Sequence, residues 1–499
     1  MRRTLGAVVA LAGAVSPAAA VEVVEKGPPE AQAVLGVGVT GRLSGTGEQI
    51  DAIPVHADGS VLDPGALASG QAALGLVLDM RYNAGQLPLI ANAEVEGYAY
   101  SGQILGEGEL AGVDVPATQS DALYLKTLFA RVSLGPFLTL GAGRTSSTWA
   151  MGLLANGGKR SADFEAGTAR FSDPYLGDTN DRLLVAVGPL TPARVQVFGF
   201  YDQVVEDDGL RPGDEATQFG GGVRLGDEKG THGGVYIVRR RQEASDGGYL
   251  EASALDLHAR APIPLGSRTL ELEAEVAFIQ GTTDFAPTVD YPTHDIRQLG
   301  GALRARLDLG GFGVVLDGLF ASGDESLADR EQNAFKADRN HELGLIVYRY
   351  MLAAQTAYVP VTASNPDLIG VPPEDLDRFP TRGGASNTLA FQPKIYWRPL
   401  PKLEVFTGPL VAFSAVPLVD PVNTNFNGGE ARNAFDGEPG NYLGTELDLG
   451  VRGQLDVVGL QLRAGLEGAM FLPGSAFADA DGQTPDALFG GRVLLETAF

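Results

Sequence analysis

The charged residues of this chain recur at every second position within several segments, and this spacing limits the chemistry they can do. Alternate side chains of an extended strand point to the same side, so each group of charges would share one face of a sheet. Carboxylate, guanidinium and imidazole groups on one wetted face can attract and steer small ions. The positions that we single out on this basis are Arg131, Asp256, His258, Arg260, Glu271, Glu273, Glu275, Arg304, Arg306, Glu446, Asp448, Arg452, Arg463, Glu467 and Arg492.

Catalysis would need a nucleophile beside a base, and the sequence gives little support for such a pair. The chain has 5 histidines and no cysteine, which excludes thiolate nucleophiles and thiolate metal sites. Ser253 and His258 share a segment, but their odd separation puts them on opposite faces of a strand. Gly-x-Ser-x-Gly, His-Glu-x-x-His and phosphate-loop motifs are not found in the sequence. We therefore expect a protein that is not an enzyme and needs no cofactor or metal.

Composition excludes further classes of protein. Of the 499 residues 67 are glycine, and the formal net charge is −25. Abundant glycine favours extended structure with many turns over a large helical protein. A strongly negative chain would repel nucleic acid phosphates, so nucleic acid is not an expected partner.

Apolar and polar residues alternate over long runs, which predicts strands. Residues 270–278 read Leu-Glu-Leu-Glu-Ala-Glu-Val-Ala-Phe, with three carboxylates on one face and apolar side chains on the other. Residues 303–309, 443–455 and 460–467 follow the same pattern. A helix would mix the two faces.

The connections between these runs fall into two length classes that alternate along the chain. Eight are tight turns and nine are longer polar segments, and 17 connections join 18 strands. We predict a closed antiparallel transmembrane β-barrel with short periplasmic turns, long external loops and both chain ends on the short-turn side. The apolar residues 343–351 are placed inside the 325–385 loop, where they can fold into the barrel mouth. Pairing them with 356–361 would give 20 strands, and merging weak runs would give 16.

The N-terminal residues are typical of a secretory leader. Two arginines precede an apolar run and an Ala-Ala-Ala triplet that ends at Ala20. We expect residues 1–20 to be a cleaved signal peptide, 21–33 a short N-terminal extension and 34–499 the barrel, located in the outer membrane of a Gram-negative bacterium.

Two segments carry a resemblance to known proteins. The C-terminal strand ends on Phe499, which resembles the terminal assembly signal of bacterial outer-membrane barrels. The segments 143–158 and 178–182 are similar to the Gly-Arg…Trp-Gly-x-Gly…Asn-x-Gly pattern of alginate-export-like porins and of an uncharacterised myxobacterial porin-like family, although Ala150 stands where that pattern usually has glycine. The resemblance implies a porin-like β-barrel and passive transport, with no particular substrate.

The expected function is an outer-membrane porin-like channel for passive diffusion of small polar solutes or ions. Two alternatives stay open: a structural or surface-interaction barrel with a plugged lumen, and a transporter of hydrophobic solutes. Expected partners are outer-membrane lipid and lipopolysaccharide, the barrel-assembly machinery and small polar solutes, while the oligomeric state is left open.

Two functional details are also left open by the sequence. The connection that begins at Trp149 can fold inward as a constriction loop or lie outside as a lid. Carboxylates at 271–275 would give the channel a weak preference for cations, whereas Arg304 and Arg306 would reverse it if they line the narrowest point.

Overall fold

The computed structural model describes residues 20–499 apart from several short gaps. The gaps are 27–30, 63–65, 85–86, 103–107, 111–112, 116–120, 136, 159–161, 164–167, 170–176, 208, 211–212, 228–229, 246, 286–290, 326–328, 359–380, 382 and 458. The predicted signal peptide therefore lies almost wholly outside the described residues.

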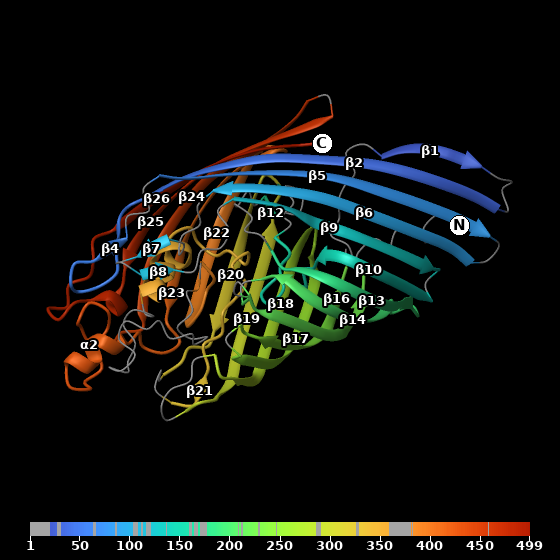
Figure 1. Cartoon of the computed structure of the whole chain (residues 1–499). Coiled ribbons are helices and arrows are strands. Elements are labelled where there is room, and N and C mark those ends of the chain that lie inside the picture. The colour runs from blue at the N-terminus through green and yellow to red at the C-terminus, as the bar shows by residue number, and fades with distance from the viewer. Residues whose placement is uncertain are drawn as a thin grey trace.

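The chain folds into one large antiparallel sheet that closes on itself (Figure 1). Its 20 strands include β1 (Ala20–Lys26) and β21 (Glu331–Gln332), which are accessory, so 18 strands form the barrel wall in the described part of the chain. The wall strands are β2 (Ala31–Ile50), β5 (Ala66–Ala84), β6 (Leu87–Gly102), β9 (Asp121–Leu134), β10 (Leu138–Ser146), β13 (Thr179–Leu190), β14 (Val195–Glu206), β15 (Glu215–Gly226), β16 (His232–Glu243), β17 (Tyr249–Leu265), β18 (Arg268–Thr283), β19 (His294–Asp308), β20 (Phe312–Ala321), β22 (Thr388–Leu400), β23 (Leu403–Phe413), β24 (Tyr442–Val457), β25 (Leu460–Pro473) and β26 (Leu488–Ala498).

Antiparallel pairing of β2 with β26 closes the barrel, with Arg42 opposite Ala498 and Ile50 opposite Gly490. Closure leaves the wall without a free edge, as a sheet in a bilayer requires. The 18-stranded antiparallel barrel predicted from the alternation of short and long connections is confirmed. Ala31 pairs with Ala84 beside one short turn, and Ala498 pairs with Gln461 beside another, so the first and last wall strands have their outer ends on the short-turn side.

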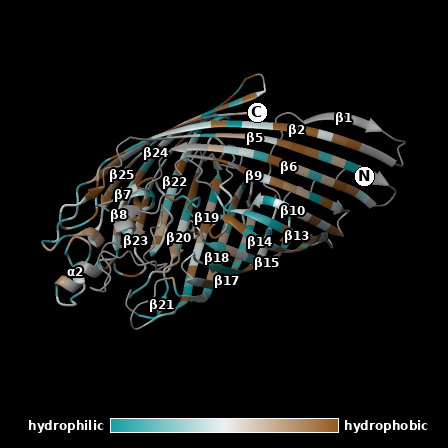
Figure 2. Cartoon of the chain, in the orientation of Figure 1, coloured by the Kyte–Doolittle hydropathy of each residue, from teal (hydrophilic) through white to brown (hydrophobic). Residues whose placement is uncertain are grey.

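Apolar and polar residues alternate along the wall strands, as the brown and teal bands of Figure 2 show. Large apolar side chains on the outward positions are exposed: Leu303 by 48%, Phe278 by 41% and Leu449 by 58%. Such a surface would be costly in water and is matched by the hydrocarbon of a bilayer. The chain is therefore a transmembrane β-barrel of the outer-membrane type. Among the described residues no helix has the length and apolar character needed to cross a membrane.

The wall strands differ in length near the seam. β2 has 20 residues and β26 has 11, so β2 continues past the end of its partner. There β1 takes over the pairing, with Ala20 opposite Gly38 and Lys26 opposite Ala33. The long strands β2, β5 and β6 project together in Figure 1. β1 and the start of β2 fall in the region expected to be the N-terminal extension.

The long connections carry the remaining elements. Three two-stranded hairpins pair β3 (Ile53–Pro54) with β4 (Val61–Leu62), β7 (Gly108–Leu110) with β8 (Val113–Val115), and β11 (Ala162–Asp163) with β12 (Thr168–Ala169). The helices are a π-helix at Val347–Leu352, α1 (Ala353–Tyr358), α2 (Pro421–Phe426) and a 3-10 turn at Ser475–Phe477.

The apolar segment 343–351 belongs to the connection between β20 and β22 and is not a strand. Residues Leu343–Ala354 pack into an apolar cluster with inward-facing wall residues from several strands, among them Leu319, Ala390, Leu410 and Phe471. The expected placement of residues 343–351 inside the long connection and inside the barrel is confirmed, and the alternative of 20 strands is wrong. The physical reason is that the apolar side chains of this segment are covered by the inner wall rather than by lipid.

Candidate functional site

Residues 342–354 of the connection between β20 and β22 are called the inward segment, and a polar cavity lies inside the barrel between this segment and the wall strands β19 to β26. Its lining holds as many basic as acidic side chains. They are Arg304, Arg306, Lys394, Arg452 and Arg492, and Asp317, Glu342, Glu404, Asp448 and Glu467. An interior of this kind holds water and ions rather than apolar molecules.

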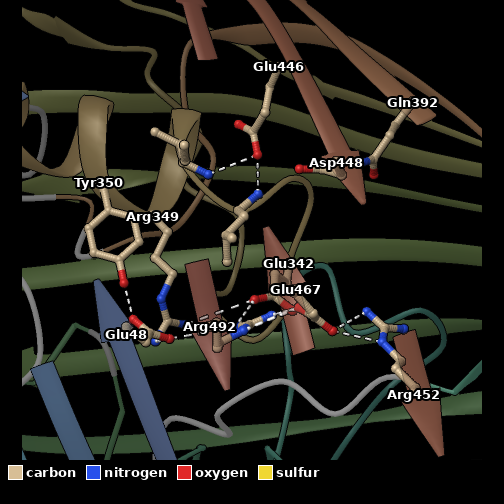
Figure 3. Close-up of polar contacts among 12 residues, drawn as sticks. Glu48, Glu342, Arg349, Tyr350, Gln392, Glu446, Asp448, Arg452, Glu467 and Arg492 are labelled. Carbon is tan, nitrogen blue, oxygen red and sulfur yellow. Dashed lines mark hydrogen bonds and ion pairs between the residues drawn. The ribbon is translucent and has the colours of Figure 1, made fainter. Parts of the chain in front are cut away.

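Arg492 of β26 is the centre of an ion network on this wall (Figure 3). Its Nη2 lies 2.6 Å from Oε2 of Glu467 on β25, and its Nη1 lies 2.8 Å from Oε1 of Glu342 in the inward segment. Glu48 of β2 is 3.8 Å from the same Nη1. The Arg492 side chain is only 2% exposed, so these charges meet where water screens them little.

Two further arginines extend the network. Arg452 Nη2 lies 2.6 Å from Oε1 of Glu467, and Arg349 Nη2 of the inward segment lies 3.0 Å from Oε1 of Glu48. The Tyr350 hydroxyl donates a hydrogen bond to Glu48. The network therefore joins the seam of the barrel to the segment that fills its interior.

A second group of charges lines the same cavity from β19, β20 and β22. Arg304 Nε lies 2.6 Å from Oδ1 of Asp317, and Lys394 Nζ lies 2.7 Å from the other oxygen of that carboxylate. One carboxylate on β20 is thus shared by cations from the two strands beside it. Cross-strand pairing of this kind follows from the antiparallel register, which puts Arg304 opposite Asp317.

The carboxylates expected to attract cations are engaged by neighbouring strands. Glu271 lies 3.4 Å from Arg260 Nη2 and 3.3 Å from Arg306 Nη1. Glu273 Oε1 lies 3.1 Å from His258 Nε2. Arg304 and Arg306 line the cavity, whereas these carboxylates do not, and the ion preference stays a prediction.

The third carboxylate of that strand, Glu275, holds the connection that follows β10. The backbone N–H groups of Met151 and Leu153 donate to its two oxygens at 2.6 and 3.2 Å. The Trp149 indole Nε1 donates to Oδ1 of Asp256 at 3.0 Å. Trp149 is 8% exposed and Leu153 is fully buried, so the start of this connection, residues 147–158, folds inward rather than forming an external lid.

An aromatic cluster supports Trp149 on the inner face of β14 and β16. Its ring stacks on Tyr236 at a centroid distance of 5.3 Å and lies 6.0 Å from Phe198. Phe200 stacks on the same tyrosine at 5.7 Å, and Arg182 lies over Phe200. Residues 183–187 and 195–201 are apolar on both faces because one face meets lipid and the other packs around this inward loop.

The inward segment is fixed by one wall carboxylate in a similar way. Glu446 of β24 accepts the backbone N–H groups of Leu345, Ile346 and Val347, the last two at 2.9 and 2.8 Å. The Tyr348 hydroxyl and Thr388 Oγ1 are 2.8 Å apart. Burial raises the pKa of the Tyr348 hydroxyl, which keeps it protonated as a hydrogen-bonding group.

The other residues singled out from the sequence have separate partners. Arg131 donates to Asn92 at 3.2 Å, Arg463 pairs with Glu496 towards the short-turn end, and Asp448 accepts from Gln392 at 2.5 Å. The described residues contain no group of three His, Cys, Asp or Glu side chains that could hold a metal.

Three residues of the central network were missed by the sequence analysis. Glu48 lies in a glycine-rich run with weak alternation, and Glu342 and Arg349 lie in a connection where strand alternation has no meaning. Arg349 sits inside an apolar run, and a charge in such a run is a usable signal of a buried ion pair. Asp317 shares the inward face of its strand with the apolar residues Val315 and Leu319, so this charge within an apolar run gave the same signal.

Phe499 lies at the seam. Its backbone N–H donates to the Gly41 carbonyl at 2.9 Å and its carbonyl accepts from the Gly41 N–H at 3.1 Å. A Cβ at Gly41 would lie 2.3 Å from the Phe499 ring, so the ring packs directly on that glycine. Its role as an assembly signal stays a prediction.

Deleting Phe499 should lower the amount of barrel in the outer membrane, because the change removes both the terminal aromatic and the last hydrogen bonds of the seam. The measurement is an immunoblot of outer-membrane fractions. Phe499→Tyr, which keeps a terminal ring, is the control and should insert normally. Normal levels of the deletion variant would count against the assembly role.

No family model matches the sequence, and no curated protein matches it. Solved structures with a similar fold include those of three proteins of Pseudomonas aeruginosa. The outer membrane protein OpdK is 10% identical with a TM-score of 0.48, covering 92% of this chain and 98% of that chain. The outer membrane protein OprD is 11% identical with a TM-score of 0.48, covering 92% and 93%. OpdQ is 10% identical with a TM-score of 0.49, covering 93% and 98%.

These similarities concern the fold alone. The resemblance to alginate-export-like and myxobacterial barrels receives no support from them. Ala150 stands at the position where that pattern usually has glycine, and its backbone adopts φ of 49°. This left-handed conformation is one that glycine adopts more readily than alanine, which explains why glycine is usual there.

Proposed function

We propose that this protein is an outer-membrane channel through which small polar solutes or ions diffuse passively. The observation that supports it most is the charged cavity inside the wall, lined by both acidic and basic side chains. Charged side chains in a barrel interior keep water in the path and need no covalent step or cofactor. A transporter of hydrophobic solutes would need an uncharged lining, whereas ten charged side chains line this cavity.

The plugged barrel is the second candidate, and one observation favours it. Leu343–Ala354 and the connection at Leu153 contribute to an apolar cluster that fills part of the interior. If these segments close the lumen completely, the charged residues would serve only as a scaffold. The open channel and the plugged barrel differ in whether water and solutes pass through the interior.

Solute entry into proteoliposomes tests this function. Vesicles that contain the purified barrel should swell in isosmotic solutions of small sugars and amino acids, and more slowly with disaccharides, because size limits diffusion past the inward segments. Vesicles without protein are the control. Vesicles that contain the folded barrel but do not swell would support the plugged alternative.

Three further features belong to the same proposal. Residues 1–20 would direct export and be removed, Phe499 would be read by the barrel-assembly machinery, and the outer surface would contact lipid and lipopolysaccharide. The exposed apolar side chains of the wall support the lipid contact.

A further inference from the structure

Two segments fold into the barrel: the inward segment, and the start of the connection after β10. Backbone N–H groups of each segment donate hydrogen bonds to one buried glutamate of the wall. Glu275 receives two such bonds and Glu446 receives three, and both side chains are 0% exposed. Buried backbone N–H groups that lose their acceptor are costly, so removing either carboxyl group would leave several donors of one segment unpaired.

Glu446 determines where the π-helix at Val347–Leu352 begins. Gly344, at φ of 70°, turns the backbone just before it, and a Cβ there would lie 2.5 Å from Leu410 and 3.2 Å from the Glu446 carboxylate. The turn therefore fits closely against one point of β23 and β24. Other anchors of the segment, such as Arg349, act through long side chains, whereas Glu446 fixes the backbone.

Glu275 has the same relation to the connection after β10. Gly152, at φ of 76°, lies between the two donors Met151 and Leu153. The two glutamates hold segments that approach each other, since Asp338 donates its backbone N–H to the Leu153 carbonyl at 2.9 Å. His341 also lies 3.2 Å from the Met151 carbonyl.

We propose that Glu446 and Glu275 are positioning residues that set the width of the solute path by fixing the two inward segments. The proposal rests on the proposed function for its effect on conductance. Loss of either carboxylate releases its segment from the wall and widens the path, without removing a strand from the barrel.

A thiol reporter makes release of the segment measurable without any transport. The chain has no cysteine, so Ala354→Cys places a single thiol on α1, at a position that is 0% exposed. In the otherwise unchanged barrel this thiol should resist a membrane-impermeant maleimide. Adding Glu446→Gln should increase its labelling rate at least about tenfold, because weaker bonds to three backbone N–H groups raise the population in which the segment is released.

Glu271→Gln is the matched control, because Glu271 contacts Arg260 and Arg306 on neighbouring strands. It should leave the thiol protected. Heat-modifiable migration on a gel checks that each variant is folded. If Glu446→Gln does not fold, Glu446→Asp, which keeps the charge on a shorter side chain, replaces it and should raise labelling to a smaller extent.

Single-channel conductance supplies the second readout. Glu446→Gln and Glu275→Gln should each conduct more than the unmodified protein, a gain that general destabilisation of the barrel would not produce. A protected thiol together with unchanged conductance in folded Glu446→Gln would overturn this inference and leave the proposed function intact. A silent unmodified protein would instead refute the proposed function, while the labelling result would still show whether Glu446 fixes the segment.

Discussion

Replacing Arg492 by methionine will destabilise the folded barrel more than removing an exposed arginine. Glu467, Glu342 and Glu48 all approach this guanidinium, and the substitution leaves buried carboxylates without their shared cation. Breaking a buried pair in this way costs about 3–5 kcal/mol. The temperature at which the folded band disappears in heat-modifiability gels should therefore fall clearly.

Arg241→Met is the matched control for that measurement. Arg241 pairs with Glu243 at 2.9 Å, but the two side chains are 64% and 63% exposed. Exposed pairs of this kind contribute about 0–1 kcal/mol. Equal losses of stability in Arg492→Met and Arg241→Met would show that the network is not a structural centre of the barrel.

The second large effect is expected in ion selectivity. The cavity lining is balanced between acidic and basic groups, so the unmodified channel should discriminate little between K⁺ and Cl⁻. Arg304→Gln with Arg306→Gln removes two cations and leaves Asp317 and Glu271 less compensated. An unbalanced unit charge at 4 Å is worth about 1 kcal/mol even in water, about fivefold in local ion concentration, so the channel should become cation-selective.

The reversal potential under a KCl gradient measures this change. Glu271→Gln with Glu273→Gln should shift it in the opposite direction, because Arg260 and Arg306 lose a partner. Both shifts should shrink near 1 M salt, where the screening length is about 3 Å. Reversal potentials that are the same in both double variants would show that these charges do not face the conducting path.

The alternation of short and long connections predicts the 18 strands, and the period of two within a strand predicts which residues share a face wherever charged and apolar residues alternate. The same period cannot tell Glu271 from Glu446, since both alternate with apolar neighbours. Glu271 pairs with arginines of adjacent strands, whereas Glu446 binds the backbone of a segment about one hundred residues away in sequence. Alternation predicts a face of the sheet and contains no information about what a loop brings to that face.

The connections between strands also show how little a local sequence pattern says about long-range contacts. Residues 343–351 have the composition of a strand, and only the parity of turns and loops argued against that assignment. Their apolar side chains are buried against Leu410 and other wall residues, so composition reflects burial rather than secondary structure. The inward position of Trp149 depends on Asp256 and on the rings of β14 and β16, which a local pattern cannot bring together.

The central claim is that a water-filled path crosses the barrel past its two inward segments. Planar-bilayer recording of the purified, folded protein tests it most directly. The account predicts discrete current steps whose size scales with salt concentration. A folded barrel that inserts into the bilayer and gives no steps would contradict it and would identify the interior as plugged.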